Sequence, residues 1–144
     1  MSKSNLRRRG FSLVELMVVC TVMVILISMA APSFRRSMEQ SRADIAGANL
    51  RAIWTAQRLY WLEERTYTAD LSVLESLDLL DPTIVAATTR YVYAISAADD
   101  STFLATATRS GSGLWTGQFT IDEDGNVSGV VQAIGEPDID PGFL

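Results

Sequence analysis

Carboxylates are the residues of this 144-residue chain that are best placed to do chemistry, because it contains no histidine and a single cysteine, Cys20. A Ser-His-Asp or Cys-His relay needs an imidazole, and the common zinc sites need Cys or His ligands. One cysteine also cannot form an intramolecular disulfide. The sequence contains neither a nucleophile elbow nor a Gly-rich phosphate loop, so it favours a protein that is not an enzyme.

One of these carboxylates, Glu15, is the only charged residue in the otherwise apolar segment 11–31. At 1.5 Å per residue this segment would form a helix roughly 32 Å long, enough to cross a hydrocarbon core about 30 Å thick. A carboxylate at the centre of such a helix costs on the order of 2.5–3.5 kcal/mol. Glu15 is therefore either an interfacial acid that reaches water or a functional group that needs a cationic partner.

A second candidate group lies in the segment DEDGN, where Asp122, Asp124 and Asn126 alternate like the first ligands of a calcium loop. Gly125 is displaced from the glycine position of an EF-hand, and no closing Glu follows at the right distance. The pattern therefore favours a hairpin turn, no metal and no cofactor, with calcium as the open alternative. Three carboxylates of the C-terminal tail are expected to be solvated, although they could join such a site: Glu136, Asp138 and Asp140.

The segment before the apolar run, residues 1–10, contains four basic residues and no acid. A basic start and an apolar run also fit a cleaved secretory signal peptide. The run is long for such a peptide, however, and the helical pattern continues past Pro32, where we expect a kink. Four basic residues precede the span and three follow soon after it, which narrowly favours a cytoplasmic N-terminus.

Residues 33–64 are predicted to form the amphipathic half of the same long helix. Its apolar stripe is expected to contain Ile45, Ala48, Ala52, Ala56 and Leu59, widened by Ile53, Trp54, Tyr60 and Trp61. Arg51, Arg58 and Arg65 fall seven residues apart on another face. These arginines form either a solvated helix face or a set of partners for acidic groups on neighbouring copies of the protein.

The rest of the chain predicts a small α+β head. Residues 65–89 are predicted to form a loop with one short helix, capped by Thr68 or Asp70 and ended by Asp81-Pro82. Residues 90–132 predict an antiparallel sheet of three or four strands, and 133–144 a tail without periodicity. The fold expected is a long N-terminal helix packed on this sheet, with strands over 90–96, 102–109, 114–121 and 126–132.

The segment RRRGFSLVELMVV resembles the N-terminus of type IV prepilins and of type II secretion pseudopilins. The short basic leader, the Gly10–Phe11 junction and an acid at the fifth position after the junction occur together. The later segment RLYWLEERTYTADLSVLESL resembles the family's aligned Tyr-x(6)-Tyr and Leu-x-x-Leu region. The resemblance in organisation covers essentially the whole chain, and it implies the type IV pilin fold.

The resemblance also implies how the N-terminus would be used. A prepilin peptidase would cut after the leader 1–10, so that Phe11 becomes the new N-terminus and is N-methylated. Glu15 would then pair with the amine of Phe11 on an adjacent subunit, and the helix 11–32 would drive polymerisation. The chain would begin as a single-pass protein of the bacterial inner membrane and, through an assembly platform, enter a periplasmic or extracellular filament.

The resemblance favours the structural subunit of a type IV pilus-like filament, with a pseudopilin of a type II secretion system as the alternative. A membrane-anchored enzyme or binding module is disfavoured by the missing catalytic motifs. With 12 basic and 17 acidic residues the chain is a poor binder of nucleic acid, unless Arg90 and Arg109 form an exposed patch. Many type IV pilins close their C-terminal region with a disulfide, so what holds this region here is an open question.

Overall fold

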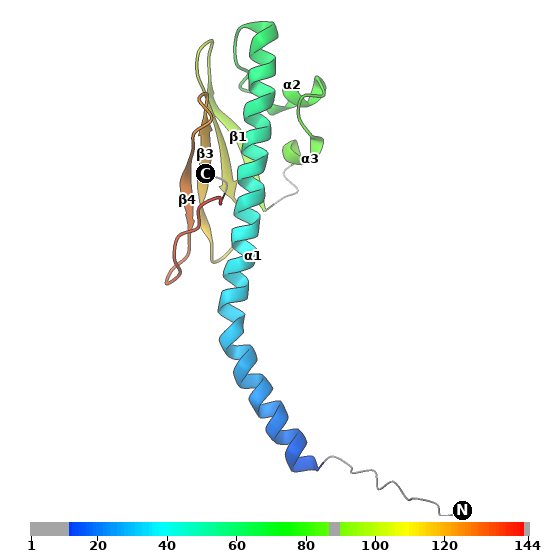
Figure 1. Cartoon of the computed structure of the whole chain (residues 1–144). Helices are drawn as coiled ribbons and strands as arrows, with labels where there is room; N and C mark the ends of the chain where they lie inside the picture. Colours follow the sequence, from blue (N-terminus) through cyan, green and yellow to red (C-terminus); the bar gives the residue numbers. More distant parts are fainter. Residues whose placement is uncertain (1–11, 87–89, 143–144) are drawn as a thin grey trace, which may run out of the picture. The chain divides into compact units, whose positions relative to one another are not determined.

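The computed structural model describes residues 12–86 and 90–142, apart from the side chains of residues 29–32. It divides into two compact units, Met1–Ser37 and Met38–Leu144. The helix α1, Leu13–Glu64, contributes its first part to one unit and its second part to the other (Figure 1).

The first part of α1 is apolar, and its side chains over residues 13–28 are exposed. Its large apolar side chains from Leu13 to Ile27 are between 43% and 74% exposed. An 18-residue window of α1 reaches a mean hydropathy of 2.6 with none of it buried, so by length and composition the helix can cross a membrane. The hydroxyls of Thr21 and Ser28 donate to the carbonyls of Met17 and Ile25, which satisfies them within the helix.

Two expectations for this part of the chain have different outcomes. The apolar helix is confirmed from Leu13 onward; Ser12 is not helical, and residues 1–11 lie outside the described part. Pro32 lies within α1, and its kink stays a prediction.

The second part of α1 packs on the sheet through a face that only partly coincides with the expected one. The buried face consists of Ala43, Ala46, Leu50, Ile53 and Ala56. Of the predicted stripe, Ile45 and Leu59 are 56% and 46% exposed, and Ala48 and Ala52 are exposed as well. Ile53 and Ala56 are buried as predicted. The prediction was wrong for the other four because this half of the helix has two apolar faces, roughly 130° apart at 100° per residue. The face with more alanines and Leu50 packs on the sheet.

Two short helices follow α1 where the sequence predicted one. Arg65 ends α1 with a left-handed φ of 58° and a hydrogen bond to the Trp61 carbonyl. Asp70 caps α2, Leu71–Ser76, by accepting from the Ser72 amide, as predicted. Asp81 caps a further helix, α3, Pro82–Val85, so the Asp-Pro pair begins a helix rather than ending one.

A four-stranded antiparallel meander completes the head. Its strands are β1 (Tyr91–Ala98), β2 (Phe103–Arg109), β3 (Thr116–Asp122) and β4 (Val127–Gln132), in that spatial order. Figure 1 shows the sheet and the two short helices on different sides of the second part of α1. The strands confirm the predicted α+β class, and their bounds differ from the expected ones by one or two residues. The sheet's buried aromatic side chains include Tyr91, Phe103 and Phe119.

The C-terminal tail is held to the head by hydrogen bonds and packing. Ile139 is fully buried and exchanges two backbone hydrogen bonds with Val131, of 2.9 and 3.0 Å. Asp44 accepts from the Gly142 amide at 2.8 Å, and the Gln40 amide donates to the carbonyl of Asp140 at 2.6 Å. These contacts answer the question that the missing disulfide raised: the tail is closed against α1 and β4 without a covalent bond.

Candidate functional site

Glu15, the acid of the apolar helix, is the first candidate site residue, and it lies within the described part of the chain. Glu15 lies in the first turn of α1, among side chains that are exposed to the surroundings of the chain. The helix dipole favours a negative charge at this end, typically by about 0.3–1 kcal/mol. Within residues 12–86 and 90–142, Glu15 forms no salt bridge. Any cationic partner of Glu15 therefore lies outside this part of the chain.

The other predicted processing residues, Gly10 and Phe11, lie outside the described residues. Their roles in cleavage and methylation stay predictions, and so does the pairing of Glu15 with the amine of Phe11.

A buried ion pair fixes the sheet to α1. The carboxylate of Glu39, 1% exposed, accepts two hydrogen bonds from the guanidinium of Arg109: one from Nε, and one of 3.0 Å from Nη2. Nη1 of Arg109 donates to the backbone carbonyls of Arg90 and Ser110. Arg42 adds a 2.9 Å contact to Glu39 from the partly exposed side. The pair therefore connects α1 with β2 and with the residue that directly precedes β1.

The charges around Glu39 decide its ionisation. Burial opposes the charged form, but hydrogen bonds and charge from Arg109 and Arg42 outweigh it and lower the pKa of Glu39 below its usual value. No local pattern indicated this pair, because its members are 70 positions apart. The burial of Arg109 also removes the exposed patch with Arg90 that a nucleic-acid contact would have required.

In the acidic turn between β3 and β4, the carboxylate of Asp122 accepts hydrogen bonds from donors within the turn itself. Asp122 Oδ1 accepts from the amides of Asp124 and Asn126 at 3.1 and 2.8 Å, and Oδ2 accepts from the Asn126 side chain at 3.1 Å. In the part of the chain that the structure describes, no group of three or more acidic or cysteine side chains is arranged to hold a metal ion. Asp122, Asp124 and Asn126 thus form a hydrogen-bonded turn whose carboxylate is already occupied.

Acid is expected to loosen the head, because several carboxylates, among them Glu39 and Asp99, have lowered pKa values. Backbone and side-chain donors of Ser101 and Thr102 lower the pKa of Asp99 to about 2. A folded pKa below the unfolded value stabilises the fold at neutral pH, and this contribution is lost as pH falls through the folded pKa. We expect the melting temperature to be constant from about pH 7 to 5 and to fall between about pH 4 and 2.

Circular dichroism of the full chain in detergent would measure this pH profile. Asp99→Asn is expected to reduce the fall in melting temperature at the acidic end of this profile. Asp140→Asn, at an exposed acid of the tail, is the matched control. A melting temperature that stays constant down to about pH 2 would contradict the role given to these carboxylates.

Comparison with known proteins agrees with this architecture. A long apolar helix followed by a head with a four-stranded antiparallel sheet is an α+β arrangement consistent with the pilin fold. Residues 5–31 match the family model described as a prokaryotic N-terminal methylation motif. These residues include the Gly10–Phe11 junction and Glu15.

Two curated relatives are homologous to about half of the chain. The type IV major pilin protein PilA of Myxococcus xanthus is 39% identical over 67 residues, which are 46% of this chain and 30% of the relative. The type II secretion system core protein G of Pseudomonas aeruginosa is 30% identical over 71 residues, 49% of this chain and 50% of the relative. The chain thus matches no more than half the length of either relative.

Proposed function

We propose that this chain is a structural subunit of a type IV pilus-like filament and is not an enzyme. The observation that supports this most is an exposed apolar helix that begins within a methylation motif. An exposed apolar surface of this size needs a lipid or protein environment. Membrane insertion before assembly, and packing against other subunits after it, would supply both environments in turn.

In this proposal the junction between Gly10 and Phe11 is cleaved by a prepilin peptidase on the cytoplasmic side of the inner membrane. The new amine of Phe11 is methylated and remains cationic. It pairs with Glu15 of an adjacent subunit, which sets the axial register of the incoming subunit. An assembly platform in the inner membrane then moves the subunit into a periplasmic or extracellular filament.

The relative from the type II secretion system supports a second candidate function. The match to core protein G spans half of that protein, a larger share than the match to the major pilin spans. As a pseudopilin the chain would form a short periplasmic filament. Deleting the gene distinguishes the two: loss of surface filaments supports the pilus, whereas loss of a secreted enzyme from the medium supports the secretion system.

The head is proposed to work without a bound cofactor or metal. The Asp122 carboxylate, the first of the calcium candidates, accepts hydrogen bonds from its own turn. The tail, a second place where a cation could stabilise the head, is already closed by its contacts with Gln40, Asp44 and Val131.

The proposed processing predicts a specific mature N-terminus. Intact-mass and fragment-ion analysis of sheared filaments is expected to find a chain that begins at Phe11 and carries one N-methyl group. Expression in a strain that lacks the peptidase is the control, in which residues 1–10 should remain on the protein. A mature chain that begins at Met1, or next to Ala31 as after signal peptidase, would contradict the proposal.

A further inference from the structure

Three exposed arginines form a row with a spacing of seven: Arg51 and Arg58 lie on the second part of α1, and Arg65 directly follows its last residue. At 100° per residue the row lies between the face of Trp54 and Trp61 and the exposed apolar face that contains Leu59 and Leu62. The row is therefore bordered by aromatic rings on one side and by aliphatic side chains on the other.

The aromatic side holds two of these arginines in place. The indole nitrogens of Trp54 and Trp61 each donate, at 2.9 Å, to a backbone carbonyl, that of Glu123 for Trp54 and that of Asp100 for Trp61. The guanidinium carbons of Arg58 and Arg65 lie 5.5 and 5.0 Å from the centres of the Trp54 and Trp61 rings. Stacking on a fixed ring reduces the side-chain entropy that binding would otherwise cost.

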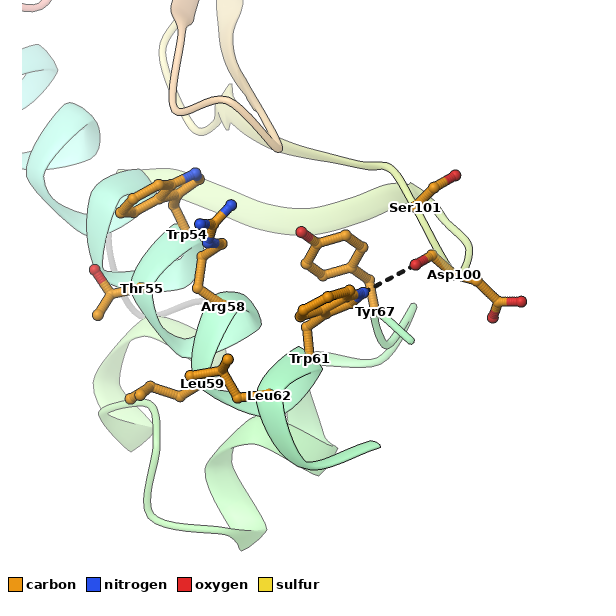
Figure 2. Close-up of a pocket in the computed structure, with 9 residues that line it drawn as sticks. All are labelled: Trp54, Thr55, Arg58, Leu59, Trp61, Leu62, Tyr67, Asp100 and Ser101. Atoms are coloured by element: carbon orange, nitrogen blue, oxygen red, sulfur yellow. Dashed lines mark hydrogen bonds between the residues drawn. The ribbon is translucent and has the colours of Figure 1, made fainter. Parts of the chain in front are cut away.

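The surface beside these stacked arginines contains a groove of about 480 Å³. Nine residues line it: Trp54, Thr55, Arg58, Leu59, Trp61, Leu62, Tyr67, Asp100 and Ser101. Figure 2 shows these side chains around the groove and the hydrogen bond from Trp61 to Asp100. Leu59 and Leu62 are 46% and 61% exposed. In the described part of the chain, neither Arg58 nor Arg65 forms a salt bridge.

The distribution of charged residues in the chain indicates which kind of partner the groove binds. From residue 38 onward the chain has 16 acidic residues and only 6 basic ones, and half of the basic ones form this row. A planar guanidinium stacked on a ring keeps its N–H edge available for a carboxylate. In a filament, neighbouring copies of the chain are always present at high local concentration, and their surfaces are acidic.

The C-terminal tail is the acidic surface with the right position. It carries Glu136, Asp138 and Asp140 and is fixed level with Gln40 and Asp44 on α1. The groove's Arg58 and the end of α1 at Glu64 lie further along the same helix, roughly 20–35 Å away at 1.5 Å per residue. A neighbouring copy displaced by this distance along the helix axis would have its tail level with the groove of the first.

We propose that the groove of Trp54, Arg58, Leu59, Trp61 and Leu62 is a docking site for the acidic C-terminal tail of a second copy of this chain. Such a contact joins two different surfaces, so it repeats from copy to copy and extends an open filament. The inference rests on the proposed function and adds to it a contact between heads, separate from the pairing of Glu15.

Charge reversal on both surfaces tests the contact in full-length protein expressed in cells. Arg58→Glu with Arg65→Glu is expected to lower the yield of sheared filaments about tenfold, a change equivalent to about 1.4 kcal/mol. Glu136→Lys with Asp138→Lys is expected to lower it similarly, and all four changes in one chain to restore at least half of it. Arg90→Glu, at an exposed arginine next to β1, is the matched charge control and should leave the yield unchanged.

Tryptophan fluorescence and the amount of processed protein in the membrane show whether each variant folds. A folded double variant that assembles normally, or a quadruple variant without rescue, would overturn the proposal. Normal filaments that lose an extracellular ligand would also overturn it, because the groove would then serve another partner.

A cross-link between purified copies tests the contact apart from the proposed function. Arg58→Lys places a primary amine in the groove, and a carbodiimide is expected to join it to the carboxylate of Glu136 on a second copy. Glu136→Gln in the same chain is the control and should abolish this product. If the wild-type chain forms no filament in any condition but the cross-link forms, the proposed function fails and the contact stands. If filaments form and no cross-link is found, the contact fails alone.

Discussion

Replacing Glu15 with alanine is expected to leave the protein inserted and processed but to reduce the yield of sheared filaments by roughly a hundredfold or more. Two opposite unit charges about 4 Å apart attract by on the order of 4 kcal/mol at an effective dielectric constant of about 20, which corresponds to about three orders of magnitude in an equilibrium. The variant loses this attraction and leaves the Phe11 amine of its neighbour unpaired. Its insertion into the bilayer is also less costly, since a membrane carboxylate is unfavourable.

Immunoblots of membrane and sheared fractions would measure insertion, processing and assembly of this variant separately. Thr21→Val is the matched control, because it removes a polar group from the same apolar segment without removing a charge. Normal filaments from Glu15→Ala would show that charge pairing does not set the register of the subunits. Loss of membrane insertion would show instead that Glu15 acts before assembly.

The second large effect is expected at the ion pair of Glu39 and Arg109. Removal of one partner from a buried pair costs about 3–5 kcal/mol, because the remaining charge is left without compensation. Glu39→Ala would leave the charge of Arg109, whose side chain is 2% exposed, without its carboxylate partner. We therefore expect the free energy of unfolding of the head to fall by about 3 kcal/mol.

Denaturant titration of the full chain in detergent, followed by tryptophan fluorescence, would measure this loss, since all three tryptophans lie beyond residue 50. Arg42→Ala is the control: its side chain is 33% exposed, so the cost is expected to stay below about 1 kcal/mol. Glu39→Met with Arg109→Met should recover much of the loss. If Glu39→Ala and Arg42→Ala lower the free energy of unfolding equally, the buried pair has no special role in stability.

Local patterns predicted the helix, the cap of α2 and the strands. The end of α1 at Glu64, the cap at Asp70 and the four strands follow from periodicity and turn residues, which act over a few positions. The choice between the two apolar faces of α1 was wrong, because it depends on which face the distant sheet packs against. The ion pair between Glu39 and Arg109 was missed for the same reason, since only the folded topology brings its members together.

The candidate site was predictable to a different degree at each residue. The composition of residues 11–31 singled out Glu15, and a carboxylate in an apolar segment needs no tertiary information to be noticed. The docking groove was not predictable, although the row of arginines that includes Arg58 was visible at a spacing of seven. Its walls depend on the hydrogen bonds from Trp54 and Trp61 to distant loops, which no local pattern indicates.

The closure of the tail has a consequence for the maturation of the head. Ile139, Pro141 and Gly142 are held by backbone hydrogen bonds, by Asp44 and by close packing of Pro141 on Gly47. Such contacts form as soon as the chain folds and require no oxidant or thiol-exchange enzyme. The head can therefore open and close again at its C-terminus as a reversible equilibrium, independent of the redox state of the compartment in which it emerges.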